Sequence, residues 1–348
     1  MATANVRLVR PDDLHRCVTE LLQSAGLPEK DAALVAQTLV EADLRGVHSH
    51  GVMRVPTYLA RIQAGEVNPR PNMRLSYDDR SRAALEADGA MGQVAADAAM
   101  RTAIERAVEY GIGAVTVRNS RHCGAMAYWA MMALDADCIG FATTNAGMNM
   151  APTGGRQKIV GNNPFAVAVP TSRPWPMVLD MATSVVAGGK LDVAALRGQE
   201  IPLGWALDPD GQPTKDPVVA RKGSLLPVGG PKGYGMAVML DVLCGVLSGG
   251  RFGGNLGAPG SGHFFLALKV EGYIPIDEFR QRMDALIDQI HASPLAPGSE
   301  RIYLPGEIEF NLEQERQRSG IPLEQRLLDR LDQLGVERGI DHRPSTWR

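Results

Sequence analysis

Polar and apolar positions alternate with a helical period over the first hundred or so residues. Pro11–Gln23 places its leucines on one stripe and is followed by Gly26, which predicts an amphipathic helix with a glycine stop. The same period predicts three further helices, over Glu29–Leu44, Ser49–Ala64 and Gln93–Tyr110.

From about residue 113 to 182 the pattern changes to short β-type runs separated by Pro/Gly-rich loops. Strands are predicted over 83–88, 113–118, 139–144, 165–170, 177–181 and 263–270, with a helix over 125–136. Residues 205–214 fit a strand, an Asp-Gly turn and a second strand. Residues 233–247 predict a buried apolar helix, 249–262 a glycine-rich loop, and 277–290 and 323–334 two amphipathic helices.

Together these elements predict a mixed α/β fold, in which helices from both termini surround a central mixed sheet near residues 113–270. At 348 residues, two domains or one domain with a large insertion are expected. The dinucleotide fingerprint G-x-G-x-x-G is absent after the first strand, and Gly111-Ile-Gly113 precedes a strand instead. Any nucleotide is therefore expected on a non-Rossmann sheet.

Composition narrows the function classes. The net charge is -3 and no dense Lys/Arg cluster occurs, so nucleic acid is not an expected partner. The four cysteines are far apart without a C-x-x-C pair, which fits a reducing compartment and a cytoplasmic protein. No apolar run predicts a membrane span, and residues 1–7 lack the apolar core of a signal peptide.

The stretch Asp43–Tyr58 concentrates chemistry around a glycine. His50, Arg54 and Tyr58 follow one another at i, i+4 and i+8, so one helical face would carry all three, with Ser49 at its start. An imidazole, a guanidinium and a phenol together can hold a small carboxylate and move a proton. The alternative is an ordinary solvated helix face.

A metal site is not expected at the same stretch. His48-Ser-His50 could form a metal pair, but no H-E-x-x-H motif or Cys/His partner accompanies it.

Three other segments carry candidate residues. Asn119–Gly124 places His122 in a loop between a strand and a helix, where it is either catalytic or merely exposed. Leu179–Ser184 ends an apolar strand with Asp180, which could orient a histidine, and with two hydroxyls that suit phosphate or a helix cap. Leu226–Gly235 places Lys232 at a helix start, where an anion would offset its unfavourable position.

These segments, in this order, resemble the type-2 malate/L-lactate dehydrogenase family, which also includes sulfolactate, ureidoglycolate and diketogulonate dehydrogenases and Δ1-piperideine-2-carboxylate reductases. The resemblance runs nearly end to end. It rests on Asp43–Tyr58, Asn119–Gly124, Thr144-Asn145, Gly161–Pro164, Leu179–Ser184, Gly229–Gly235 and Pro305-Gly306-Glu307. Two positions depart from the usual pattern: Ala146 stands where a hydroxyl residue is more common, and Cys123 where an aromatic one is.

The resemblance implies NAD- or NADP-dependent interconversion of a small 2-hydroxy acid and a 2-oxo acid, or reduction of a cyclic imino acid, by a homodimer. It implies His50 as proton donor or acceptor with Asp180 as its partner, His122 as a second catalytic histidine, and Ser49, Arg54 and Tyr58 at the substrate. The implied cofactor contacts are His122, Thr144, Asn145, Val178, Leu179, Asp180, Met181, Ala182, Thr183, Ser184, Lys232, Gly233, Pro305, Gly306 and Glu307.

Residues 113–299 would then form the NAD(P)-binding domain, and 1–112 with 300–348 a helical substrate-side domain. Two other classes stay open from sequence: a metal-dependent lyase using His48, His50 and His122, and a non-catalytic metabolite-binding protein.

Overall fold

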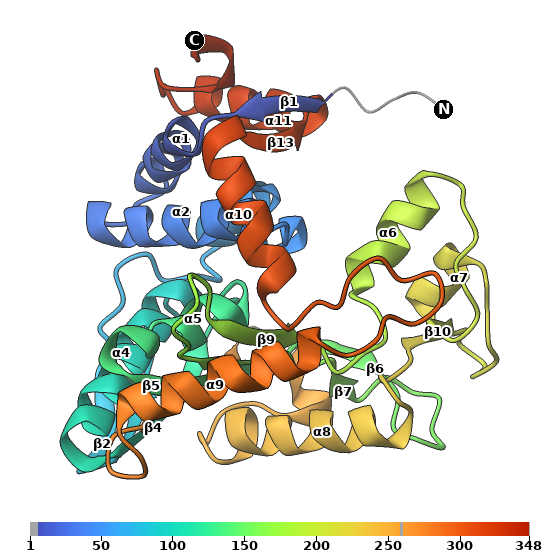
Figure 1. The fold of residues 1–348 in the computed structure, drawn as a ribbon. Coiled ribbons are helices and arrows are strands. Elements are labelled where there is room, and N and C mark those ends of the chain that lie inside the picture. Colours follow the sequence, from blue (N-terminus) through green and yellow to red (C-terminus); the bar gives the residue numbers. More distant parts are fainter. Residues whose placement is uncertain (1–5, 258–259, 348) are drawn as a thin grey trace.

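The computed structural model describes residues 6–257 and 260–347 and shows a mixed α/β fold (Figure 1). The strands are β1 Val6–Val9, β2 Arg74–Asp79, β3 Arg82–Glu86, β4 Ile112–Ser120, β5 Cys138–Thr144, β6 Met148–Met150, β7 Val160–Gly161, β8 Phe165–Val169, β9 Met177–Met181, β10 Ala206–Leu207, β11 Ser224–Leu225, β12 Ser261–Lys269 and β13 Ile321–Glu324. The helices are α1 Pro11–Ser24, α2 Glu29–Leu44, α3 Val55–Gln63, α4 Gly92–Tyr110, α5 Met126–Met131, α6 Gly188–Leu196, α7 Pro217–Lys222, α8 Pro231–Asp241, α9 Ile276–His291, α10 Glu307–Ser319 and α11 Gln325–Glu337.

The main sheet has the strand order β2-β3-β4-β12-β5-β8-β9. Only β3 and β4 pair in parallel among these neighbours, and α4 forms the crossover between them. The other neighbouring pairs are antiparallel. This arrangement confirms the mixed, non-Rossmann sheet, because a Rossmann sheet is mostly parallel.

One face of the sheet lies directly under α4 and α5, because small residues line both surfaces. A Cβ added at Gly113 would lie 1.9 Å from the Ala103 carbonyl oxygen of α4. One added at Gly140 would lie 2.0 Å from the Ala130 carbonyl oxygen of α5. Glycine at these two strand positions therefore allows the helices to approach the sheet closely.

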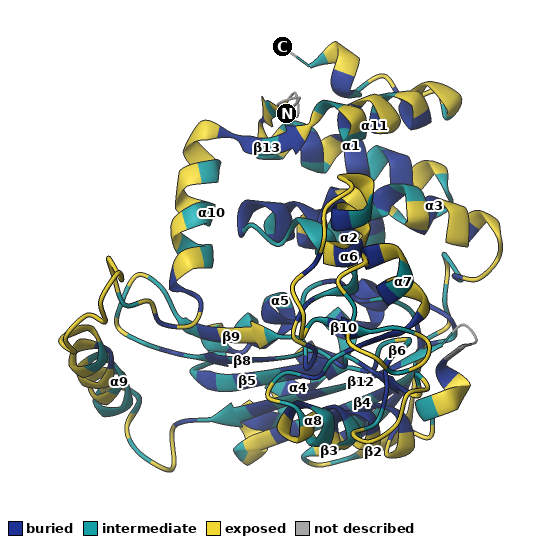
Figure 2. Cartoon of the chain, turned by 90° about the vertical axis from the view of Figure 1, so that its right-hand side faces the viewer, coloured by how far each residue is buried: buried dark blue, intermediate teal, exposed yellow. Residues whose placement is uncertain are grey.

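The opposite face of the sheet carries large apolar side chains. The strand register aligns Leu266, Phe141, Val167 and Leu179 in one row across four strands. Leu179 is 38% exposed, and the other three side chains are half-buried. Helix α9 stands away from the sheet (Figure 2). Much of this face is therefore uncovered in the single chain.

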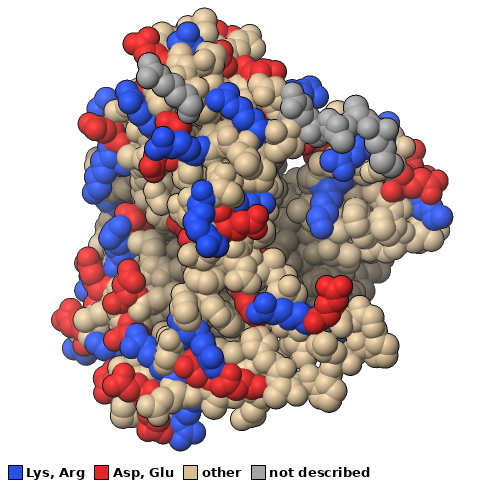
Figure 3. Space-filling model, turned by 45° about the horizontal axis from the view of Figure 1, so that its top comes forward, with Lys and Arg blue, Asp and Glu red and all other residues tan. Residues whose placement is uncertain are grey.

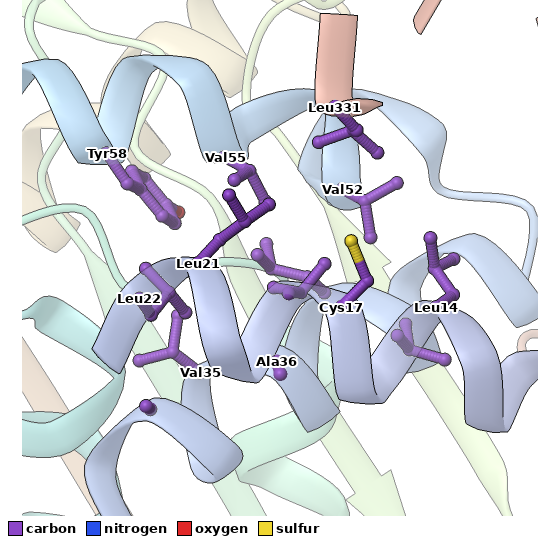
Figure 4. Packing of buried hydrophobic residues seen from close by; sticks show 14 of the residues in the cluster. Leu14, Cys17, Leu21, Leu22, Val35, Ala36, Val52, Val55, Tyr58 and Leu331 are labelled. Atoms are coloured by element: carbon purple, nitrogen blue, oxygen red, sulfur yellow. The ribbon is translucent and has the colours of Figure 1, made fainter. Parts of the chain in front are cut away.

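The helical part packs α1, α2, α3 and α11 around one apolar cluster (Figure 4). The predicted stripe of α1 is confirmed, since Leu14, Leu21 and Leu22 are fully buried. Strands β1 and β13 pair antiparallel and bring segments near the two termini together. Helix α10 runs from this part toward the sheet (Figure 1). A third part combines the small sheet β10-β11-β6-β7 with α6 and α7.

Several sequence-based boundaries were wrong for identifiable reasons. The helix predicted over Ser49–Ala64 begins only at Val55, because Gly51 is extended and two 3-10 turns, His48–His50 and Val52–Arg54, precede it. The last helix, predicted over 323–334, starts only at Gln325, because Leu323 and Glu324 belong to β13 and pair with β1.

The apolar helix predicted over 233–247 is not fully buried. Helix α8 and the π-helical turn Val242–Val246 bury Ala237 and Leu240 but expose Met239 and Val246. In the predicted 249–262 loop, Gly253–Gly257 forms a 3-10 turn, and residues 258 and 259 lie outside the described part. Helix α10 was not predicted, because its polar sequence has no apolar stripe.

The proposed division at residues 112–113 stays a prediction. Strands β2 and β3 nevertheless enter the main sheet from before residue 113. In the described part of the chain, no helix is long and apolar enough to cross a membrane.

Candidate active site

A buried carboxylate sets the shape of the His48–Arg54 turn. Asp43, at the end of α2, is 2% exposed, and its carboxylate accepts a hydrogen bond from the Val52 amide at 2.8 Å. Its other oxygen lies 2.7 Å from His48 Nδ1. A Cβ at position 51 would lie 2.2 Å from this carboxylate, so only glycine fits there. His48 is thus a structural residue of the turn.

The turn directs His50 and Arg54 to one place, although they do not share one α-helix. His50 Nδ1 lies 2.9 Å from Ser49 Oγ. Arg54 Nε donates to the Ser49 carbonyl oxygen, which fixes the guanidinium. Its terminal nitrogens have no protein partner among residues 6–257 and 260–347. Burial, assisted by the charge of Arg54, lowers the pKa of His50 to about 4.

His122 joins this group from the loop after β4. Its ring stacks on that of His50, with 5.5 Å between the centroids. Tyr58 of α3 lies with its hydroxyl 2.7 Å from His122 Nδ1. Burial holds the pKa of His122 well below its ordinary value, with smaller contributions from His50 and Arg54. Both imidazoles are therefore neutral at pH 7.

Sequence analysis missed Gln93, which completes the group. Its side chain is fully buried, and Nε2 donates to the Tyr58 hydroxyl at 3.1 Å. A long polar side chain in the first turn of an Ala-rich helix was the available sign, because such a group is rarely buried without a partner.

Asp180 lies on β9, on the sheet face that α5 covers. Its carboxylate accepts a hydrogen bond from the Ala127 amide at 2.8 Å. Loss of hydration raises the pKa of Asp180 to about 6. The side chain is nevertheless exposed, so contact with water reduces this rise. The expected contact with His50 is absent from the hydrogen bonds of the described residues, where the partner of His50 is Ser49.

Two of the expected cofactor segments lie side by side. The Val178 amide donates to the Pro305 carbonyl oxygen at 3.0 Å. Gly306 has a φ of 88°, and a Cβ there would lie 2.9 Å from the Val178 nitrogen. The structure thus brings β9 against the turn that starts α10.

A third expected segment packs against the end of β9. The Val228 amide donates to the Thr183 carbonyl oxygen at 2.9 Å, and a Cβ at Gly233 would lie 2.9 Å from that same oxygen. Lys232 is exposed in the first turn of α8. The hydroxyl of Thr183 is buried without a hydrogen-bond partner in the described part. An unpaired buried hydroxyl beside a helix start fits a polar ligand.

The side chains of two other expected cofactor residues, Asn145 and Glu307, already have hydrogen-bond or ion-pair partners within the protein. Asn145 donates to Asp241 at 3.0 Å and to the Arg251 carbonyl oxygen at 2.8 Å. It also accepts from the Gly262 amide at 2.9 Å. Glu307 is ion-paired with Arg301 and lies 3.1 Å from His291. These side chains shape the surrounding loops.

Thr144 belongs to a buried polar cluster around His263, which sequence analysis also missed. His263 is fully buried, with Nδ1 2.8 Å from Thr144 Oγ1 and Nε2 2.8 Å from Ser120 Oγ. Burial lowers its pKa to about 4. A histidine in a strand pattern gave no indication of such a cluster.

Across the described residues, no group of three or more His, Cys, Asp or Glu side chains could hold a metal ion. Two surface hollows, of about 470 and 360 Å³, lie elsewhere, beside Arg156 and Lys158 and beside Ile104 and Met132. Neither borders a candidate residue. A further recess is visible between the helical part and the part that carries α6 and α7 (Figure 3).

Comparison with known proteins identifies the class to which this fold and site belong. Residues 9–332 match the family described as malate/L-lactate dehydrogenase. The malate dehydrogenase of Pyrococcus abyssi is 42% identical over 342 residues, 94% of each chain. The L-sulfolactate dehydrogenase of Methanocaldococcus jannaschii is 35% identical, covering 96% of this chain and 98% of the relative. The solved malate dehydrogenase of Pyrococcus horikoshii aligns with a TM-score of 0.89 at 37% identity over 98% of both chains.

The protein is therefore a dehydrogenase, an oxidoreductase that acts on CH–OH groups. More particularly, the chain belongs to the malate/L-lactate dehydrogenase family, whose dehydrogenases use nicotinamide cofactors. This result confirms the resemblance seen in the sequence. It decides against the two other classes left open there, a metal-dependent lyase and a non-catalytic metabolite-binding protein.

Proposed function

We propose that this enzyme interconverts a small 2-hydroxy acid and the corresponding 2-oxo acid, with malate and sulfolactate as the first candidates. The names of its relatives support this substrate class. The observation that carries the proposal is the convergence of Arg54, His50 and His122, in which Arg54 keeps its terminal nitrogens free for a carboxylate.

His50 is the proposed proton acceptor in oxidation. Its lowered pKa keeps the imidazole neutral at pH 7, so it can take the proton of the substrate hydroxyl. In reduction it must be protonated first. A bound carboxylate would offset the charge of Arg54 and so raise the pKa of His50, which would make it available as an acid.

Ser49 positions the His50 ring in this proposal, and Tyr58 positions His122. Asp180 is linked to the same loop-and-helix segment as His122, because its carboxylate accepts from the amide of Ala127, five residues after His122 in the chain. In this proposal the carboxylate of Asp180 acts electrostatically and favours positive charge nearby.

The residues around β9 fit a dinucleotide. The proposed contacts are His122, Thr144, Asn145, Val178 to Ser184, Lys232, Gly233 and Pro305 to Glu307. The unpaired Thr183 hydroxyl, the close approach at Gly306 and the exposed Lys232 support this placement. When bound, the nicotinamide accepts or donates the hydride. Both NAD and NADP remain candidates.

A panel assay tests the proposal. The purified protein is supplied with NADH or NADPH and with oxaloacetate, sulfopyruvate, pyruvate or a cyclic imino acid, and cofactor oxidation is followed by absorbance. We expect turnover of a 2-oxo acid. Turnover of the imino acid alone would assign the reductase activity instead, and no turnover with any compound would contradict the proposal.

We further propose that the enzyme is a homodimer. The support is the uncovered apolar row Leu266–Phe141–Val167–Leu179 on the main sheet, together with the exposed Met239 and Val246. Light scattering coupled to size exclusion should give twice the chain mass. A monomer at micromolar concentration would contradict this.

A further inference from the structure

The hydrogen bonds around His122 run in one direction. Gln93 Nε2 donates to the Tyr58 oxygen at 3.1 Å, and that hydroxyl lies 2.7 Å from His122 Nδ1. A hydroxyl has one proton to give. The Tyr58 oxygen accepts from Gln93, which leaves the Tyr58 proton available to His122 Nδ1, the other atom within hydrogen-bond distance of the hydroxyl.

A second donor reaches the same nitrogen. The Gly124 amide lies 3.4 Å from His122 Nδ1 and points its N–H at it. A backbone N–H can only donate, so this long contact also favours Nδ1 as an acceptor and acts in the same direction as Gln93 and Tyr58. With Nδ1 unprotonated, neutral His122 must carry its proton on Nε2.

The Gly124 contact also disfavours hydrogen bonds that run the opposite way, from His122 to Tyr58 and on to Gln93. If the Gln93 amide were turned, Oε1 would accept from Tyr58, and Tyr58 would accept from a protonated Nδ1. That N–H would then face the N–H of Gly124. A neutral Tyr58 oxygen could also accept from both Gln93 Nε2 and a protonated Nδ1, but that Nδ1–H would again face the Gly124 N–H. Burial raises the pKa of Tyr58, so the phenol keeps a proton to donate to Nδ1.

The start of α4 packs closely against the backbone at His122. Gln93 is the second residue of α4, whose first residue, Gly92, touches the backbone before and at His122. A Cβ at Gly92 would lie 2.1 Å from the Arg121 carbonyl oxygen. The start of α4 therefore positions both Gln93 and the main chain of His122.

We propose that Gln93 is a positioning residue that acts through Tyr58 to hold His122 as the Nε2–H tautomer, so that His122 donates a hydrogen bond to the substrate and leaves proton transfer to His50. Nε2 of His122 has no protein partner in residues 6–257 and 260–347, so it is free to donate to a carbonyl or hydroxyl oxygen. The assignment of these two roles rests on the proposed function, whereas the tautomer does not.

A neutral imidazole can polarise a carbonyl as a donor without giving up its proton. In that arrangement the stacked histidines differ. Ser49 can either donate to or accept from His50, so His50 can change protonation state, but His122 meets only donors at Nδ1. Two similar side chains thereby obtain separate tasks.

Nitrogen-15 NMR of histidine-labelled protein tests the tautomer directly and needs no substrate. The His122 signals are assigned by comparison with His122→Gln. We expect a protonated Nε2 and an unprotonated Nδ1 in the free wild-type protein. A protonated Nδ1 would overturn the proposal, and this result would stand even if every Gln93 variant failed to fold.

Gln93→Met removes the donor while nearly keeping the volume. We expect the Nε2–H tautomer to become a mixture, and kcat to fall roughly five- to tenfold with KM little changed, because one neutral hydrogen bond is involved. Gln93→Glu supplies an acceptor instead and should shift His122 toward the Nδ1–H form. An unchanged tautomer and unchanged kcat in both variants would overturn the proposal.

Thr102→Val serves as the control, since Thr102 lies on the same helix and its hydroxyl bonds only the Ala98 carbonyl oxygen. It should leave the tautomer and kcat unchanged. A wild-type protein with the expected tautomer but no turnover of any 2-oxo acid would contradict the proposed function and leave the role of Gln93 in the tautomer intact.

Discussion

Two histidine clusters meet the chain near the end of β4, one at Ser120 and the other at His122 in the loop that follows, and they differ in one respect. Around His263 both ring nitrogens have hydroxyl partners, at 2.8 Å each. Around His50 and His122 each ring has one nitrogen with a partner and one without, in the described part of the chain. Burial lowers the pKa of all three imidazoles.

Burial and pKa therefore do not separate a catalytic histidine from a structural one here. Ring nitrogens without a protein hydrogen-bond partner separate them, because a fixed polar atom without a partner is available to a ligand. The same criterion separates Arg54, with free terminal nitrogens, from Arg45, which is buried and ion-paired with Glu313 at 2.8 Å.

The largest expected difference between the clusters is in catalysis. His50→Ala should lower kcat by roughly 10²–10⁴-fold, the usual contribution of positioned proton transfer, with little change in thermal stability. Steady-state kinetics and a melting curve measure both. His15→Ala is the control, because His15 lies on α1 and its ring hydrogen-bonds to the Ala33 carbonyl oxygen and, among the described residues, to none of the candidate residues. An equal loss of kcat in both variants would remove His50 from the mechanism.

His263→Ala should act on stability instead. It leaves the Ser120 and Thr144 hydroxyls in the core without their imidazole partners, which should cost roughly 3 kcal/mol of unfolding free energy. Urea unfolding gives the value, and kcat of the remaining folded enzyme should be near normal. A stable variant with low kcat would assign His263 to the reaction and weaken the distinction between the clusters.

The sequence could predict those site residues that lie at a regular spacing along the chain. His50, Arg54 and Tyr58 were found from their spacing, although Gly51 breaks the helix that the spacing assumed. Their convergence survives because Asp43 clamps the turn, and a contact between residues eight to nine apart leaves no periodic pattern. The apolar stripe of α1 was predictable because burial alone determines it.

Gln93 and His263 could not be found in this way. Each is a polar residue buried within its element, and its partners come from other elements, Tyr58 for one and Ser120 with Thr144 for the other. The Thr144-Asn145 pair illustrates a different situation. Its polar sequence suggested ligand contacts, which stay a prediction, but the structure shows side chains already hydrogen-bonded to Gly262 of β12 and to Asp241 at the end of α8.

The pH dependence of stability should come partly from the same buried cluster. The pKa of His263 is about 4 in the folded state, below its ordinary value of about 6.5 when unfolded. As pH falls below 6.5, the unfolded chain takes up a proton that the folded protein does not, so this stability is present above pH 6.5 and is lost toward pH 4.

Between pH 7 and 4.5 this one group should remove roughly 2 to 3 kcal/mol of unfolding free energy. Urea unfolding at both pH values, for wild type and His263→Gln, isolates it. The variant should lose that much less than wild type over the same interval. Parallel pH profiles would show that His263 is not the titrating group.

The smallest expected effect concerns substrate binding. Arg54→Ala should raise KM for the hydroxy acid about 30-fold, since a charge-assisted hydrogen bond to a carboxylate contributes roughly 2 kcal/mol, and kcat should fall less. Arg45→Ala removes the other arginine near the turn, whose ion pair is structural, and should lower stability without changing KM in the folded enzyme. Arg54→Lys keeps the charge but not the planar fork, so it should restore KM only in part. An unchanged KM in Arg54→Ala would mean that another residue holds the carboxylate, and free terminal nitrogens would then not separate a substrate-binding arginine from a structural one such as Arg45.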